Sequence, residues 1–325
     1  MQVLIIKTSS MGDVLQTLPA LTDAVNALPG ISFDWVVEED FVQIPTWHPA
    51  VRRVISVAIR RWRKNWFDKS SRQERWNFKW QLQLEHYGAI IDAQGLIKSA
   101  VLITRIARGK KHGLDYKSAR EPCASFFYHQ RHNVGKEQHA IERIRQLFAV
   151  SLDYPLSADT LGDYAISGHF TPPQGDKAYL IFLHATTRPE KHWPEAYWRA
   201  LIHLASDAGY RIKLLWGVEY EHLRARRLAK GFDAAEVLAP LTLAEVAAQL
   251  VGATAAVSVD TGLGHLAAAI NCPKLTLYGP TDPRLIGSYG NNQQILRAKD
   301  GKMESISPEC VWRRLKLMLS LSGLR

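Results

Sequence analysis

The sequence of 325 residues is poor in cysteine and contains no long apolar run. Its three cysteines, Cys123, Cys272 and Cys310, are widely spaced and odd in number, which argues against a disulfide framework and gives no metal-ligand spacing. The longest apolar stretches, such as 253–259, are far shorter than the roughly 20 residues that span a bilayer. No basic leader or cleavage site precedes the first apolar strand. We therefore expect a cytoplasmic protein without a membrane span.

Three ligand-binding fingerprints are also missing. The dinucleotide pattern G-x-G-x-x-G does not follow the first apolar strand, and the Walker A pattern does not occur. These absences argue against a dehydrogenase and against an ATPase. No Asp-x-Asp pair follows a strand in a setting that would hold a divalent metal on a diphosphate. We expect no metal site and no cofactor, so that cations and backbone N–H groups would neutralise a bound phosphate.

The positive charge is unevenly distributed. The chain has 41 Lys and Arg against 31 Asp and Glu, a net charge of +10. Residues 1–150 carry 22 basic and 14 acidic side chains, whereas residues 151–325 carry 19 and 17. Within the first half, "RRWRKNWFDKSSRQERWNFKW" (60–80) combines eight basic residues with four tryptophans and two phenylalanines. The first half is therefore the part that we expect to meet an anionic partner.

Strand and helix signals alternate along the chain, which predicts an α/β fold with parallel sheets and right-handed crossovers. The predicted strands are 2–7, 33–38, 88–93, 178–185, 211–217, 235–239, 255–260 and 274–279. The predicted helices are 13–28, 97–108, 194–209, 219–231, 242–253, 264–270 and a terminal helix at 308–320. Because the chain exceeds the usual size of one core, we expect Rossmann-like domains at 1–160 and 177–325, facing each other across a cleft and joined by a breaker-rich linker at 161–176.

An acidic residue, Asp13, lies where the first apolar strand turns into a helix, in "KTSSMGDVLQTLPALTDA" (7–24). The preceding run "VLII" is unbroken, as in a strand that is covered on both faces. Open α/β proteins bind ligands at this carboxyl edge of the sheet. A carboxylate that only caps its own helix explains Asp13 equally well at this point.

The turn "HATTRPEKHWPEAYW" (184–198) in the second half has a phosphate-binding character. It offers the hydroxyls of Thr186 and Thr187 and the ammonium of Lys191 just before a predicted helix. Hydroxyls and a lysine beside a helix N-terminus suit phosphate oxygens.

Two later turns share this character. In "WGVEYEH", Glu221 lies one turn into a helix, where a carboxylate suits ribose hydroxyls or the helix dipole alone. In "SVDTGLGHLAAA", Asp260 and Thr261 precede Gly262, whose backbone N–H suits an anion, and His265 adds a donor. A histidine before "LAAA" is also typical of a half-buried side chain without a ligand. Three such turns on one sheet edge together predict a nucleotide or phosphate site.

At this point the sequence resembles the ADP-heptose:lipopolysaccharide heptosyltransferases of glycosyltransferase family 9. The resemblance runs nearly end to end, through "KTSSMGDVLQTLPALTDA", "FDWVVEEDF", "RRWRKNWF", "IDAQGLIKSA", "FLHATTRPEKHWPE", "SVDTGLGHL" and "YGPTDP". The "SSMGD" form favours the heptosyltransferase I branch over the "WVGD" form of the second enzyme. The resemblance implies the GT-B fold, with the acceptor bound mainly by the first domain and the donor by the second. It also implies inverting transfer of L-glycero-D-manno-heptose from ADP-heptose to the Kdo region of Kdo2-lipid A, in the inner core.

The resemblance also implies residue roles. Asp13 matches the general base that takes the proton of the acceptor hydroxyl, and Lys191 would offset charge on the departing ADP. The other positions that match donor contacts are Thr186, Thr187, Glu221, Asp260, Thr261, Gly262 and His265. Position 264 is Gly, where some relatives have Ser.

The basic segment then has a candidate partner, because Kdo2-lipid A carries carboxylates and phosphates above acyl chains. The expected acceptor-side cations are Arg60, Arg61, Arg63, Lys64, Lys98 and Arg120. We expect Trp62, Trp66 and Phe67 to rest on the apolar part or at the bilayer interface, with the enzyme held peripherally at the inner face of the cytoplasmic membrane. An amphipathic helix with its tryptophans against the core is the alternative.

Three rival functions remain at this stage. A nucleic-acid-binding protein would explain the basic, aromatic segment but not Asp13 or the phosphate-type turns, so we expect no nucleic-acid partner. A GT-B-like nucleotide-sugar epimerase would share the architecture and the sugar nucleotide. A plain binding module gives no reason for a carboxylate at the cleft edge.

Overall fold

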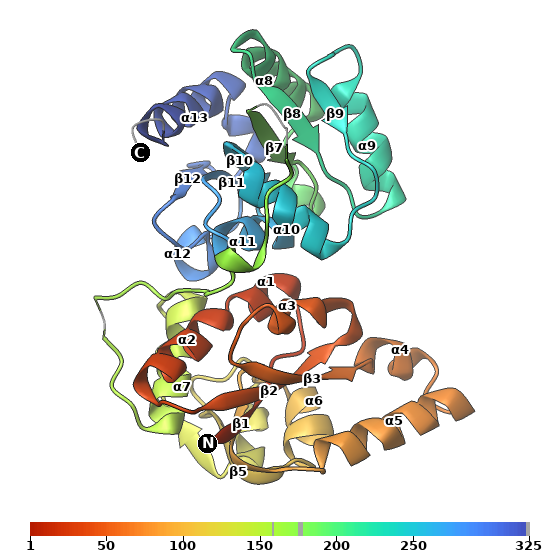
Figure 1. Ribbon diagram of the computed structural model, residues 1–325, viewed down its shortest axis with the longest axis vertical. Helices are drawn as coiled ribbons and strands as arrows, with labels where there is room; N and C mark the ends of the chain where they lie inside the picture. The colour runs from red at the N-terminus through yellow and green to blue at the C-terminus, as the bar shows by residue number, and fades with distance from the viewer. Residues whose placement is uncertain (158, 175–177, 323–325) are drawn as a thin grey trace. The chain divides into compact units, whose positions relative to one another are not determined.

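The computed structural model describes residues 1–157, 159–174 and 178–322, and the chain divides into two compact units, Met1–Ala165 and Ile166–Arg325. Each unit contains a six-stranded sheet with helices around it (Figure 1). The strand pairs are parallel in both sheets, as the alternation predicted. The division falls within the segment 161–176 that we expected as a linker, of which 175 and 176 lie outside the described residues.

The first sheet has the order β3-β2-β1-β4-β5-β6, so β1 is central. Its strands are β1 (Gln2–Ile6), β2 (Ser32–Glu38), β3 (Val51–Val57), β4 (His86–Asp92), β5 (Arg108–Leu114) and β6 (Gln130–His132). The helices of this unit are α1 (Met11–Leu15), α2 (Leu18–Ala27), α3 (Gln43–Thr46), α4 (Ile59–Lys64), α5 (Lys69–Leu82), α6 (Ile97–Ser99) and α7 (Ala140–Leu152). Short 3₁₀ segments cover Glu39–Phe41 and Pro122–Phe127, and a π-helical turn covers Ala100–Thr104.

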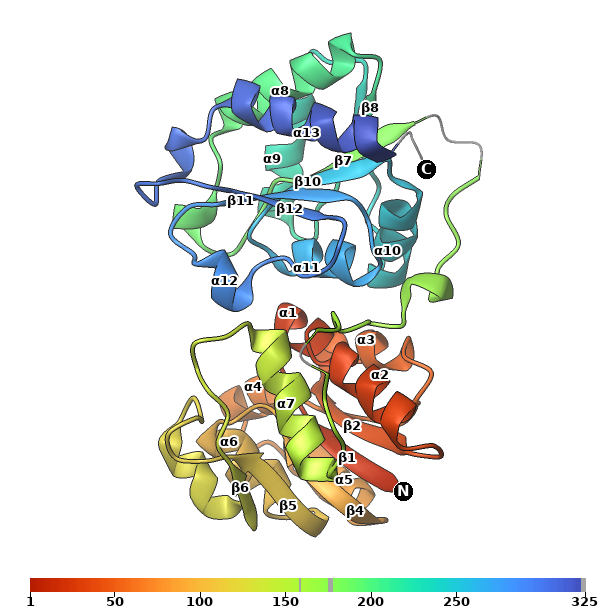
Figure 2. The same cartoon turned by 90° about the vertical axis from the view of Figure 1, so that its left-hand side faces the viewer.

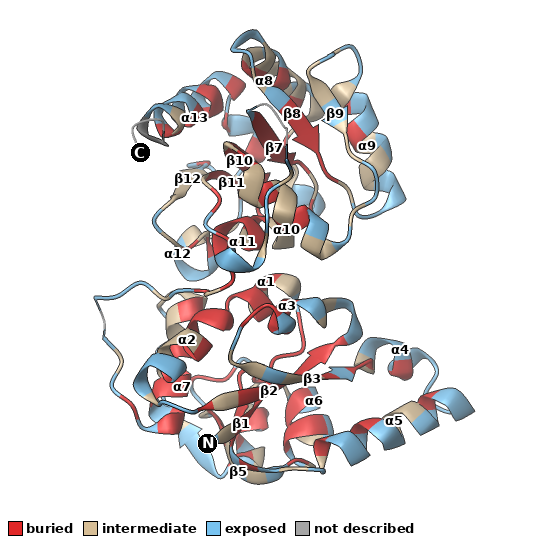
Figure 3. Cartoon of the chain, viewed as in Figure 1, coloured by how far each residue is buried: buried red, intermediate tan, exposed pale blue. Residues whose placement is uncertain are grey.

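Helices cover both faces of the first sheet (Figures 1 and 2). On one face α2 packs against α7, and Phe33 of β2 meets Phe148 of α7 with ring centroids 6.2 Å apart. On the other face Trp62 of α4 and Phe78 of α5 pack on apolar side chains of β1 to β4. Burial from both sides explains why β1 is an unbroken apolar run, and Figure 3 shows its residues almost entirely buried.

The second sheet has the order β12-β11-β10-β7-β8-β9, so β10 lies between β7 and β11. Its strands are β7 (Tyr179–Leu183), β8 (Arg211–Leu214), β9 (Ala235–Val237), β10 (Ala255–Val259), β11 (Lys274–Tyr278) and β12 (Gln293–Arg297). The helices are α8 (Glu195–Asp207), α9 (Glu219–Ala229), α10 (Leu243–Gly252), α11 (Gly262–Ala269), α12 (Pro283–Ile286) and α13 (Pro308–Ser322), with 3₁₀ segments at Ser167–His169, Pro189–Lys191 and Met303–Ser305.

The second unit has the same layered construction. Helices α8, α9 and α13 share one apolar cluster with the sheet, in which the rings of Trp193 and Trp198 lie 5.0 Å apart. Helices α10 and α11 cover the opposite face (Figure 2). The terminal helix expected at 308–320 is α13, and the structure shows what the sequence could not, that it packs on α8 and places Val311 and Leu315 in the shared apolar cluster.

Two predicted helices of the first half differ from the structure. The helix predicted at 13–28 is two helices, because Pro19 lacks an N–H and starts α2 afresh in its first turn. The helix predicted at 97–108 is only Ile97–Ser99 followed by the π-helical turn. There the hydroxyl of Thr104 donates to the carbonyl of Ser99 at 3.2 Å and to Asp92 at 2.7 Å, which accompanies the wider turn.

The sequence patterns missed four strands, β3, β5, β6 and β12. Strand β5, "RGKKHGL", has no apolar pattern, because it is rich in glycine and basic residues. Its neighbours leave little room for side chains at the two glycines. A Cβ at Gly109 would collide with the carbonyl of Tyr87, and one at Gly113 with the ring of Tyr128. Glycine at these two positions permits the close pairing and hides the strand from a hydrophobicity pattern.

Candidate functional site

Asp13 lies in the first turn of α1, at the carboxyl edge of the first sheet. Its Oδ2 accepts hydrogen bonds from the backbone N and the Oγ of Ser10, both at 2.8 Å. Its Oδ1 lies 3.6 Å from Nζ of Lys7, and 38% of the Asp13 side chain is exposed. Asp13 therefore does cap its helix, and the cap leaves the carboxylate accessible. A side chain that is fixed in this way is pre-oriented for chemistry.

The turn before Asp13 is held by Gln94, which follows β4. The Oε1 of Gln94 accepts from the backbone N of Thr8 at 2.7 Å and of Ser9 at 3.2 Å, and its Nε2 donates to the carbonyl of Ser9 at 3.0 Å. Asp92 accepts from the backbone N of Gln94 at 3.0 Å. Asp92 is fully buried, and this burial raises the pKa of its carboxyl. The end of β4 thus fixes the end of β1.

In the second unit, three strand ends meet at Asp260, which follows β10. Its Oδ2 lies 2.5 Å from Nζ of Lys191 and accepts from Oγ1 of Thr281 at 2.8 Å. Its backbone carbonyl accepts from Oγ1 of Thr186 at 3.0 Å. Because β10 lies between β7 and β11, the sheet order brings these chain segments together, and only 8% of the Asp260 side chain is exposed.

The remaining residues expected on this edge lie in neighbouring turns. Thr261 precedes α11, Gly262 is its first residue, and His265 lies in its first turn. Thr187 is exposed beside Thr186. Glu221 lies in the first turn of α9, where its Oε2 accepts from a backbone N–H of the preceding turn at 2.8 Å. Glu221 therefore supports the start of α9, and its contact with a ribose stays a prediction.

The cations expected on the acceptor side have different surroundings. Arg61 forms paired hydrogen bonds of 2.9–3.1 Å with Glu39 and with Glu74. Its guanidinium lowers the pKa of the Glu74 carboxyl. Two carboxylates already neutralise Arg61, so it is less available to an outside anion than its neighbours are.

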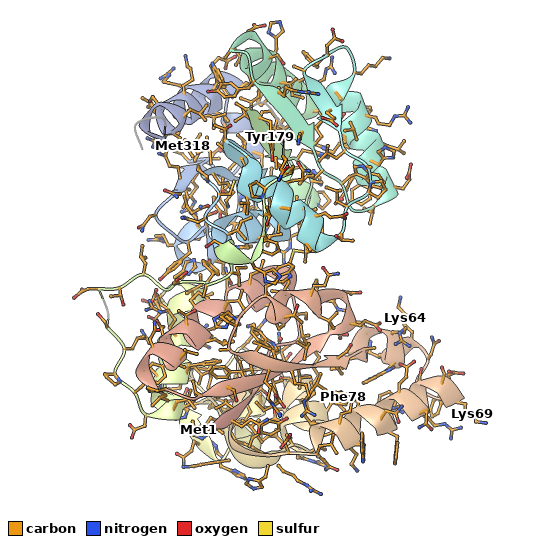
Figure 4. The ribbon with its side chains drawn as sticks, in the orientation of Figure 1. Met1, Lys64, Lys69, Phe78, Tyr179 and Met318 are labelled. Atoms are coloured by element: carbon orange, nitrogen blue, oxygen red, sulfur yellow. The ribbon has the colours of Figure 1, made fainter. Side chains whose placement is uncertain are left out.

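Other expected cations are open to solvent. Arg63 and Lys64 are exposed and form no ion pair in the part of the chain that the structure describes. Figure 4 shows Lys64 at the outer end of α4 and Lys69 at the start of α5. Lys98 and Arg120 are exposed as well. Arg60 lies 3.8 Å from Asp40, and its guanidinium lies 5.9 Å from the ring centroid of Phe41.

The expectation for Trp62 is wrong. Its ring is buried against Phe78, 5.9 Å between centroids, and its Nε1 donates to Glu74 at 2.7 Å. Trp62 therefore belongs to the core of the first unit and cannot rest on a lipid surface. Trp66 and Phe67 do face solvent, with exposures of 44% and 89%.

Comparison with known proteins decides the family. The family model described as "Glycosyltransferase family 9 (heptosyltransferase)" matches residues 75–316. The chain belongs to glycosyltransferase family 9. It is an enzyme that transfers heptose, and the resemblance drawn from its sequence motifs is confirmed.

Relatives and solved structures match this heptosyltransferase over nearly its full length. The Escherichia coli K12 protein named "Lipopolysaccharide heptosyltransferase 1" is 58% identical over 317 residues, 97% of this chain and 99% of that protein. The structure titled "E. coli heptosyltransferase WaaC with ADP" has a TM-score of 0.95 at 56% identity and covers 98% of this chain and 100% of that chain. The structure with ADP-2-deoxy-2-fluoro heptose has a TM-score of 0.92 at 56% identity and covers 98% and 99%. These matches confirm the predicted fold class.

Three residues join the heptosyltransferase's candidate site only through the structure. Lys7, Gln94 and Thr281 lie in "KTSSMGD", "IDAQG" and "YGPTDP", which carried the family resemblance. In the sequence, only their position within these motifs pointed to them. Their contacts join separate strands, so no local pattern could predict which atoms meet.

Replacing Gln94 with leucine is expected to lower kcat of this heptosyltransferase by about 10- to 100-fold, because the turn before Asp13 loses its anchor. Three backbone groups of Thr8 and Ser9 would lose their partner, which costs about 2 kcal/mol of unfolding free energy. Rates of ADP release and urea unfolding measure the two effects. Gln146→Leu on α7, which breaks the amide pair with Gln138, is the matched control. Wild-type kcat in a folded Gln94→Leu variant would contradict the positioning role.

Proposed function

We propose that the chain transfers L-glycero-D-manno-heptose from ADP-heptose to the Kdo region of Kdo2-lipid A, with inversion at the anomeric carbon. The single observation that carries this proposal is the full-length match to the E. coli structures titled with ADP and with ADP-2-deoxy-2-fluoro heptose. The geometry of both units supports it, since each places polar side chains at the carboxyl edge of its sheet.

The cluster around Asp260 suits the donor's diphosphate and heptose. Lys191 has three N–H donors, of which Asp260 occupies one, so its charge is held in place and remains able to meet phosphate oxygens. The N-terminus of α11 adds backbone N–H groups from Gly262 onward. In this proposal Thr186 and Thr187 contact the phosphates, Asp260 a heptose hydroxyl and Glu221 the ribose.

Asp13 suits the general base of the transfer. The acceptor hydroxyl oxygen bonds to the anomeric carbon of the heptose, while the bond from that carbon to the phosphate oxygen breaks and ADP leaves. Asp13 takes the proton of the hydroxyl, and its carboxylate stabilises positive charge that develops on the sugar. Lys191 offsets the negative charge on the departing ADP. No metal takes part in this scheme, and no cofactor is needed.

The direct test is transfer in the presence of excess EDTA. Purified protein with ADP-heptose and Kdo2-lipid A should release ADP and raise the acceptor mass by one heptose, at the same rate with and without the chelator. Donor turnover without acceptor would instead indicate an epimerase. RNA retention on filters with a steep salt slope would indicate the nucleic-acid function. No heptose on the acceptor would overturn the proposed acceptor, and loss of transfer in EDTA would overturn the metal-independent scheme.

We also propose that the first unit holds the enzyme reversibly at the cytoplasmic face of the inner membrane. No helix among residues 1–157, 159–174 and 178–322 is long and apolar enough to cross a bilayer. The segment 60–80 exposes Phe67, Trp76 and Trp80 among its basic residues. Near an anionic surface each cation contributes about 1 kcal/mol, so several cations with aromatic anchors suffice for reversible binding.

Replacing Phe67 with aspartate is expected to reduce sedimentation with anionic vesicles at low salt by about fivefold, because the residue would enter the interface as a charge. Leu317→Asp, an equally drastic change at an exposed apolar residue of α13, is the matched control and should sediment as the wild type does. Equal sedimentation of wild type and Phe67→Asp would contradict the membrane-facing role of this segment.

A further inference from the structure

Lys274 is a buried lysine that the transfer chemistry above does not use. It begins β11, and only 1% of the residue is exposed. Its Nζ donates to Oγ1 of Thr276 at 2.9 Å and to Oγ of Ser288 at 2.5 Å. It forms no ion pair with any residue that the structure describes. An ammonium that is buried without a carboxylate is costly, so a lysine at this position needs a reason to be there.

The amine lies beneath the first turn of α11. The Lys274 side chain runs along β11 toward its carboxyl end, as its bond to Thr276 shows. A Cβ built on Gly264 would lie 3.6 Å from this Nζ and 2.7 Å from Oγ of Ser258. Gly264 is the third residue of α11, so the amine lies within van der Waals distance of the turn that begins at Gly262, while the missing side chain leaves room for the hydroxyl of Ser258.

The charges around Lys274 are unbalanced. Burial lowers the pKa of its amine to about 7, and the more distant carboxylate of Asp260 opposes this shift. Asp260 is already paired with Lys191. The N-terminus of α11 adds partial positive charge, which has the same sign as an ammonium. A second negative charge at this turn would therefore favour the charged form of Lys274.

Other titratable groups face the same region. Burial raises the pKa of Cys272 and of Tyr278 to about 12, so both stay neutral near pH 7. His265 lies in the first turn of α11, and His192 lies beside Lys191 with a pKa that burial lowers. These two imidazoles are the groups, other than Lys274, that could take up a proton when an anion binds.

We propose that Lys274 is an electrostatic positioning residue of the donor site, a buried amine that takes up a proton as the donor's diphosphate binds at the first turn of α11. This inference rests on the proposed function, because it takes α11 as the diphosphate site. The bound anion stabilises the ammonium, and by linkage the ammonium strengthens anion binding by the same free energy. Because the donor complex holds more protons than the free enzyme, donor affinity falls as the pH rises through 7.

Calorimetric titration with ADP-2-deoxy-2-fluoro heptose, in two buffers of different ionisation enthalpy, counts the protons. A diphosphate diester has no group that titrates between pH 6 and pH 8, so the protons belong to the protein. The wild type should take up about half a proton or more per donor at pH 8 and almost none at pH 6. Lys274→Met should lose this uptake and bind the donor about fivefold more weakly at pH 6.

The matched control is Lys213→Met, which replaces another buried lysine of the same sheet, one that donates to Gln249. It should keep the wild-type uptake. Donor binding without uptake at pH 8 in the wild type overturns the inference, even if the Lys274→Met variant fails to fold. Uptake that persists in Lys274→Met overturns it too and assigns the proton to His265 or His192. If the wild type does not bind the donor analogue at all, the proposed function fails first.

Discussion

Replacing Asp13 with asparagine is expected to lower kcat by about 10³-fold, while the affinity for ADP-heptose stays within about twofold of the wild type. Asparagine keeps an oxygen that accepts from Ser10, so the cap of α1 survives, but it cannot take the proton of the acceptor hydroxyl. Initial rates of ADP release with saturating Kdo2-lipid A give kcat, and calorimetry gives donor affinity. A loss confined to kcat would support the proton-accepting role.

The control for Asp13 is a second capping carboxylate with the same contacts. Glu245 accepts from the backbone N of Thr242 at 2.7 Å and from its Oγ1 at 2.8 Å, at the start of α10. Glu245→Gln therefore repeats the chemical change at a cap that the proposed mechanism does not use, and kcat should stay near the wild-type value. If Asp13→Asn also turned over at the wild-type rate, Asp13 would be a helix cap only.

Replacing Lys191 with methionine is expected to lower kcat/KM by about 10²- to 10³-fold, since the leaving diphosphate loses its nearest proposed cation. The change also strands the carboxylate of Asp260, which keeps only the hydroxyl of Thr281 as a side-chain partner in the described structure. A largely buried pair that loses one member costs about 3 kcal/mol of unfolding free energy. Steady-state rates and urea unfolding separate the two effects.

Two further variants show whether Lys191 acts on the reaction or only on the fold. In Lys191→Met combined with Asp260→Asn, stability should largely recover because no buried charge is left unpaired, whereas activity should stay low. Arg211→Met breaks the exposed 3.5 Å pair with Glu236 and should change neither property by a measurable amount. Activity that recovers together with stability would contradict a role for Lys191 at the leaving group.

The helices and strands that the sequence predicted well are those with a strong local pattern. Strands β1, β7, β10 and β11 are buried and are therefore rich in apolar residues, which mark them plainly even though β10 includes Ser258 and β11 includes Lys274 and Thr276. Strands β3, β6 and β12 lie toward the sheet edges and carry polar residues. Strand β5 has glycine at two positions where a side chain would collide with neighbouring residues. Their stability comes from neighbouring strands, so their own sequence does not mark them.

The segment 60–80 shows the same limit for surface residues. Its composition predicted an anionic partner, yet it could not separate Trp62, which packs on Phe78, from Phe67, which is almost fully exposed. Likewise, the composition could not distinguish Arg61, which is paired with two carboxylates, from Arg63 and Lys64, which are exposed. Partners 13 to 22 residues away in sequence decide these differences, and only the folded chain brings them close.

By itself the sequence determined that this chain is an α/β protein of two parallel-sheet units, and its turns identified the family and the residues expected at the strand ends. These features are local, because a strand followed by a polar turn and a helix is encoded within about 20 residues. The tertiary structure decided which turns share a site. Strand order places β10 between β7 and β11, and so unites Thr186, Lys191, Asp260 and Thr281. The tertiary structure also placed Lys274 beneath α11, since burial and charge environment depend on packing between segments that are distant in the chain.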